Sequence, residues 1–180
     1  GYMLMGLGLF TPLALAGSVF YILHHIIVKT NLFLVSGVVE YLGKTAVLKR
    51  LGGLYRSQPV LAILFLIPAM SLAGIPPLSG FFAKFNLIKA GLIESQYWVV
   101  GVALLVSLFT LFSMIKLWNE AFWKPEPQEY DASTRKITRS MILPIVFLAS
   151  LTVLIGIGIG PAFEVAMRAG LQLSEPGLYI

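Results

Sequence analysis

Cysteine is absent from this chain of 180 residues, and charged residues are scarce. Without cysteine the chain can form neither a disulfide framework nor a thiolate metal site. Charged residues make up 12% of the sequence, whereas a soluble domain usually carries about 25%. The hydrophobic share is 58% and the mean hydropathy is +0.88. This composition argues against a soluble domain and indicates a membrane protein.

Motifs for enzyme chemistry are also missing. The sequence has no metal-ligand cluster, no nucleophile triad and no phosphate-binding loop. The glycine-rich stretch 156–160 ends an apolar run, where it allows helices to pack closely. We therefore expect a protein that is not an enzyme and that holds no cofactor and no metal.

Apolar runs of about 20 residues, long enough to cross a hydrocarbon core, recur along the chain. They predict an all-α, polytopic membrane helix bundle over residues 1–160 and an extramembrane tail over 161–180, with a short surface helix near 162–169. The expected spans are 1–10 (partial), 13–39, 60–91 (broken), 97–118 and 140–160. Because the first run is too short to span, we expect that an N-terminal part of the parent protein is absent.

Basic residues cluster in two segments between apolar runs, 40–59 and 119–139. Each segment holds four of them: Lys44, Lys49, Arg50 and Arg56, then Lys124, Arg135, Lys136 and Arg139. Cytoplasmic loops of membrane proteins carry such an excess. The net charge of +5 therefore indicates orientation in a prokaryotic plasma membrane and not nucleic-acid binding. We expect both loops in the cytoplasm and the C-terminus on the outer side.

A polar stripe follows one face of the expected helix 13–39. At about 100° per residue, its members fall within a narrow arc. They are Ser18, Tyr21, His25, Lys29 and Ser36. A lysine at bilayer depth costs about 2.5–3.5 kcal/mol on insertion scales, so Lys29 indicates a functional site. Histidine exchanges protons near neutral pH, so His25 and Lys29, one turn apart, can pass a proton.

The alternative is that these polar groups only hold helices together, which is common for serine and asparagine. It applies to Ser18, Ser36 and Tyr21, and to Asn31 on another face. His24 shares that other face with Asn31, so we expect His24 to be structural.

A second feature is the break predicted inside the run 60–91. Pro76 and Pro77 lie between Gly74 and Gly80, and a proline pair disrupts a helix and the residue before it. Irregular backbone at membrane depth survives where it is buried in protein or lines a water-filled cavity. Lys84 follows shortly after the break, which makes it a second candidate site. The alternative is a packing kink with a snorkelling lysine.

Three stretches resemble a known family: 25–37, which begins His-Ile-Ile-Val-Lys; 73–85, Ala-Gly-Ile-Pro-Pro-Leu-Ser-Gly-Phe-Phe-Ala-Lys-Phe; and 52–56, Gly-Gly-Leu-Tyr-Arg. Together with Gly1-Tyr2-Met3 they resemble the antiporter-like membrane subunits of multisubunit cation/proton antiporters, membrane-bound hydrogenases and respiratory complex I. The chain is similar to the D-subunit branch of the Mrp-type sodium/proton antiporters. The likeness covers nearly the whole chain and is strongest over residues 1–91.

This resemblance implies two inverted five-helix repeats, each with a broken helix and a half-channel, of which the chain holds most of the second. It implies that His25 and Lys29 belong to a central proton relay and that Lys84 lies near the exit. Tyr21 stands where some relatives have a second histidine. The family's first-repeat glutamate and lysine have no counterpart here.

The sequence therefore predicts a proton-conducting subunit of a monovalent cation (sodium)/proton antiporter. Its expected partners are other membrane subunits, the lipid bilayer, protons and monovalent cations. Two alternatives remain open: a proton-pumping subunit of an NADH-quinone oxidoreductase or hydrogenase complex, and a scaffold whose polar groups only pack helices.

Overall fold

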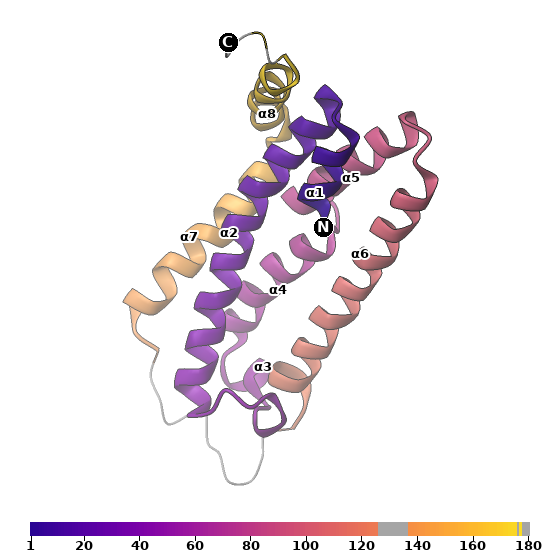
Figure 1. The fold of residues 1–180 in the computed structure, drawn as a ribbon. Helices are drawn as coiled ribbons and strands as arrows, with labels where there is room; N and C mark the ends of the chain where they lie inside the picture. The colour runs from indigo at the N-terminus through magenta and orange to yellow at the C-terminus, as the bar shows by residue number, and fades with distance from the viewer. Residues whose placement is uncertain (126–136, 176, 178–180) are drawn as a thin grey trace.

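Helices make up every regular element in the computed structural model, which describes residues 1–125, 137–175 and 177 (Figure 1). The expected all-helical bundle with one broken helix is confirmed. In chain order the elements are α1 (Tyr2–Leu9), α2 (Pro12–Gly43), the short 3₁₀ helix η1 (Leu48–Arg50), α3 (Leu54–Ser57), α4 (Pro59–Ala73), α5 (Ser79–Ile93), α6 (Tyr97–Trp118), the π-helical turn η2 (Asn119–Trp123), α7 (Arg139–Ile157) and α8 (Ile159–Ser174).

Helix α2 is the central element and packs against α1, α4, α5, α7 and α8. The Thr11 hydroxyl accepts a hydrogen bond from the Ala14 amide at 3.2 Å, and Pro12 occupies the first helical position. Both features favour a helix start. The helix runs four residues past the expected end at Val39 and stops at Lys44, which adopts a left-handed conformation. Residues 40–42 include neither glycine nor proline, so the helix continues through this segment, which was expected to be loop.

The expected break separates α4 from α5. Gly74 ends α4 with a φ of 92°, a conformation that glycine adopts without steric cost. Its amide donates to the carbonyls of Met70 and Ser71, which closes the last turn. Helix α5 then begins at Ser79, beyond the two prolines. The polypeptide between the half-helices is thus too short to leave the bundle.

Helix α6 has the bounds expected from the sequence, but the chain stays helical through η2. Segment 119–123 was expected to be loop. It remains wound because Phe122 packs between Phe65 and Trp118, each with its ring centre 5.0 Å away. Residues 126–136, including Arg135 and Lys136 of the expected basic loop, lie outside the described residues.

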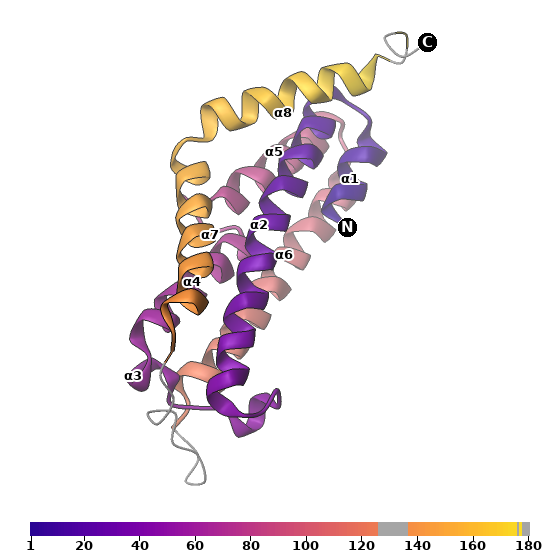
Figure 2. The same ribbon diagram turned by 90° about the vertical axis from the view of Figure 1, so that its left-hand side faces the viewer.

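Among the described residues, three helical segments are long and apolar enough to cross a membrane: Pro12–Gly43, Tyr97–Trp123 and Arg139–Ile157. Helix α8 lies across one end of the bundle, over the start of α2 (Figure 2). The two helices touch at Gly170, where a Cβ would lie 2.5 Å from the Pro12 carbonyl oxygen. Helix α8 runs from Ile159 to Ser174 and is thus longer than the short helix expected at 162–169.

Candidate functional site

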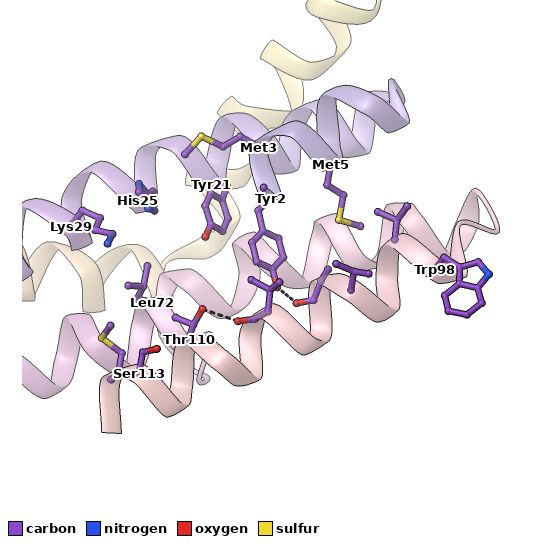
Figure 3. Close-up of a pocket in the computed structure, with 16 residues that line it drawn as sticks. Tyr2, Met3, Met5, Tyr21, His25, Lys29, Leu72, Trp98, Thr110 and Ser113 are labelled. Carbon is purple, nitrogen blue, oxygen red and sulfur yellow. Dashed lines mark hydrogen bonds between the residues drawn. The ribbon is translucent and has the colours of Figure 1, made fainter. Parts of the chain in front are cut away.

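Three members of the polar stripe line a groove between α2 and α6. Tyr21, His25 and Lys29 follow one another along α2, and Thr110 and Ser113 of α6 lie on the opposite wall (Figure 3). The groove has a volume of about 760 Å³. The helical spacing predicted from the sequence thus does place these three side chains on one surface.

A second groove, of about 200 Å³, extends farther along α2 and is lined by Ser36. Lys29 and Met114 line both grooves. Lys29 therefore lies where the two spaces meet, and Ser36 lies on the far side of it from His25.

Ser18 is the member of the stripe that lies outside both grooves. Its hydroxyl donates to the Met3 carbonyl at 3.0 Å, and its side chain is buried under α1. Helix α1 covers the first turns of α2, so the same face of α2 meets protein at Ser18 and open space at His25. A helical wheel shows the face but not the neighbour that covers it.

Aromatic rings continue the polar stripe toward α1. The Tyr21 ring stacks on His25 at 5.8 Å and on Tyr2 at 5.2 Å between ring centres. The Tyr2 hydroxyl lies 2.7 Å from the Ser107 hydroxyl and donates to the Ala103 carbonyl. Tyr2 and Ser107 were not predicted, because neither belongs to a polar pattern within its own helix.

The Lys84 amine is buried where α4, α5 and α6 meet. Only 4% of its surface is exposed, which rules out snorkelling to the end of the bundle. The Nζ atom donates to the Ala73 carbonyl at 3.2 Å and to the Ser107 hydroxyl at 3.0 Å. It also lies 5.1 Å from the centre of the Tyr2 ring, within the range of a cation–π contact. Ser107 thus joins Lys84 to Tyr2 and, through the stacked rings, to His25.

The two glycines of the break make room for functional side chains. A Cβ on Gly74 would lie 3.0 Å from Lys84 Cδ, and a Cβ on Gly80 would lie 2.8 Å from His24 Nε2. Lys84 of α5 therefore packs against the backbone at the end of α4, and His24 of α2 packs against the backbone at the start of α5. The freed Ala73 carbonyl, at the end of α4, is the one that Lys84 contacts.

No carboxylate compensates either lysine within the described residues. One ion pair is found in this part of the chain, between Lys124 and Glu120 at 3.3 Å. The same residues include no group of three or more potential metal ligands. The Lys84 amine contacts one carbonyl, one hydroxyl and one ring, and these neutral groups can hold an amine without fixing its charge.

Comparisons with known proteins match the chain to a family and to curated relatives. Residues 1–110 match the family described as NADH:quinone oxidoreductase/Mrp antiporter, transmembrane. The whole chain is 46% identical to the D subunit of the Na⁺/H⁺ antiporter of Alkalihalophilus pseudofirmus and 34% identical to that of Bacillus subtilis. In both cases it spans 36% of the relative's length.

A solved structure shares the fold. A chain in the structure of the Mrp complex from Dietzia sp. DQ12-45-1b superposes with a TM-score of 0.87 at 32% identity. The match covers 99% of this chain and 41% of that one. The chain, with its broken helix and the helix that crosses the end of the bundle, is about a third as long as the curated relatives.

Proposed function

Because the chain belongs to the NADH:quinone oxidoreductase/Mrp antiporter transmembrane family, we propose that it forms the proton-conducting part of a sodium/proton antiporter subunit. The buried Lys84 amine at the helix break carries this proposal. Its surroundings can accept it in either protonation state, since each contact is to a neutral group.

The proton route that we propose runs along α2 and ends at Lys84. Ser36, Lys29 and His25 border the two grooves, and Lys29 stands where the grooves meet. Tyr21, Tyr2 and Ser107 lie between His25 and Lys84. Water in the grooves would supply the hydrogen bonds over the distances that side chains do not cover. Ser18 supports the route by fixing α1 on α2.

We also propose an orientation and partners. Four basic residues, Lys44, Lys49, Arg50 and Arg56, lie between α2 and α4 at the end opposite α8. This end would face the cytoplasm, and α8 with the C-terminus would lie on the outer side of a prokaryotic plasma membrane. Other membrane subunits would complete the assembly, because the solved structure that shares this fold is that of an Mrp complex.

The direct test replaces Lys84 by methionine in the full-length protein within its complex. Sodium added to inside-out vesicles dequenches a pH-sensitive dye when antiport occurs. Lys84→Met should reduce this response to background, whereas Lys89→Met should retain it because Lys89 lies on the same helix but is exposed. Equal co-purification of the other subunits would show that both variants assemble. A normal response from Lys84→Met would refute the proposal.

A further inference from the structure

His24 lies against the broken helix, on a face of α2 that differs from the face of His25. Its side chain is 1% exposed, and its Nδ1 atom lies 2.9 Å from the Ser79 hydroxyl. Ser79 is the first residue of α5. Helix α2 therefore contacts the broken helix at the point where its second half begins.

Hydroxyl groups connect this contact to both half-helices. The Ser79 hydroxyl lies 3.2 Å from the Ser71 hydroxyl, which accepts a hydrogen bond from the Gly80 amide at 3.2 Å. Ser71 lies in the last turns of α4. The first amides of a helix lack partners within it, and Leu78 provides no side-chain cap for α5. Ser71 takes over that role, and His24 ties the pair of serines to α2.

We propose that His24 is a positioning residue that fixes the start of α5 and thereby the place of the Lys84 amine. Lys84 follows Ser79 by about one and a half turns of a single helix, so a shift at Ser79 moves Lys84 with it. This proposal rests on the proposed function, because the position of Lys84 affects transport only if Lys84 carries the proton.

Nδ1 makes the one hydrogen bond that the ring forms with the described residues. Nε2 is buried and has no hydrogen-bond partner among them. The ring also contacts the Tyr21 ring edge to face, at 5.7 Å between centres. If His24 only filled space, a side chain of similar size and shape would replace it. A positioning role instead needs a polar atom at the place of Nδ1.

Asparagine and glutamine separate these two roles. Asparagine carries its amide near the position of Nδ1, and glutamine carries it near the position of Nε2. The position of α5 can be measured by double electron–electron resonance between spin labels at Glu40 of α2 and Glu94 after α5, both of which are exposed. The labels are placed in the full-length protein within its complex, free of other cysteines.

His24→Asn should keep the wild-type distance distribution, and His24→Gln should shift or broaden it. Ser79→Ala should change the distribution at least as much as His24→Gln, because it removes the Ser71 contact as well as the His24 contact. Adding His24→Gln to Ser79→Ala should change nothing further. His25→Gln is the matched control and should leave the distribution unchanged, since the Ser79 contact is made by His24. A wild-type distribution in His24→Gln and Ser79→Ala, or an equal change in His24→Asn, would overturn the positioning role.

Transport measured on the same variants tests the link to function separately. The maximal antiport rate of His24→Gln should fall about tenfold, the size expected for one net hydrogen bond, at an unchanged KM for sodium. His24→Asn should rescue most of that loss. If the distance distribution shifts as expected while transport stays normal, His24 positions α5 but Lys84 does not carry the proton. That outcome would contradict the proposed function and would leave the positioning contact between His24 and Ser79 intact.

Discussion

Lys84 and Tyr2 share one hydrogen-bonding partner, the Ser107 hydroxyl. The amine donates to it at 3.0 Å, and the phenol oxygen lies 2.7 Å from it. The amine also faces the Tyr2 ring at 5.1 Å. Three helices, α1, α5 and α6, thus meet at one hydroxyl. A buried amine usually needs a partner to offset its desolvation, and here a serine and a ring provide it instead of a carboxylate.

Tyr2→Phe should weaken antiport without stopping it. Phenylalanine keeps the ring that faces Lys84 but removes the hydroxyl that binds Ser107 and the Ala103 carbonyl. Each of these two hydrogen bonds corresponds to a decrease of up to about tenfold in rate. Tyr2→Leu also removes the cation–π contact and should decrease the rate further. Initial dequenching rates in vesicles measure the order, and Tyr2→Leu performing as well as Tyr2→Phe would exclude a role for the ring.

Lys29→Met should abolish sodium-dependent antiport, because Lys29 is the charged residue that lines both grooves. Methionine keeps most of the length of the side chain and fills a similar space without a proton-carrying group. Thr30→Val is the matched control, since Thr30 is the next residue of α2 and is exposed. Vesicle dequenching distinguishes them. Antiport at the wild-type rate in Lys29→Met would remove Lys29 from the route.

The helices and the break could be predicted from the sequence because each has a strong local cause. The apolar run before Trp118 has the length of a membrane span, and α6 has the predicted bounds. Two prolines prevent a continuous helix whatever surrounds them, so α4 and α5 are separated around Pro76 and Pro77 as expected. The periodicity of α2 likewise placed His25 and Lys29 on one surface.

The contacts across helices could not be predicted, because they depend on which neighbour covers each face. Ser18 and His25 share a face of α2, but α1 covers the first and leaves the second at the groove. His24 was expected to be structural, and nothing in its own helix indicates that Ser79 lies opposite. Tyr2 and Ser107 are far apart in the sequence and meet only because α1 and α6 both pack around Lys84.

Gly80→Ala should strongly destabilise the fold at the break. A Cβ at this position would overlap the Ser71 carbonyl oxygen and lie 2.8 Å from His24 Nε2. Overpacking of this kind typically costs about 1–3 kcal/mol, and backbone atoms cannot yield as a side chain can. Gly101→Ala in α6 is the control, because its Cβ would meet nothing within 4 Å apart from its chain neighbours and the backbone of its own helix. Thermal unfolding of the purified complex, monitored by size-exclusion chromatography, should show a lower midpoint for Gly80→Ala and not for Gly101→Ala. Equal midpoints would contradict the close packing at the break.

The orientation of the bundle gives a prediction that does not depend on transport. Glu175→Cys, directly after α8, should react with a membrane-impermeant maleimide in intact cells. Ala46→Cys, in the basic segment between α2 and α4, should react only after the membrane is permeabilised. Both positions are exposed, so a difference in labelling reports the side of the membrane and not burial.

The physical reason for this labelling prediction is that basic residues are distributed unequally between the two ends of the bundle. Lys44, Lys49, Arg50 and Arg56 lie together in the segment of Ala46, whereas the described part of the end that follows α7 holds a single basic residue, Arg168. Moving four cations across a bilayer during insertion is opposed, so we expect the end that carries Ala46 to stay in the cytoplasm. Labelling in the opposite order would reverse the orientation. The residues that line the grooves beside Lys29 would stay the same.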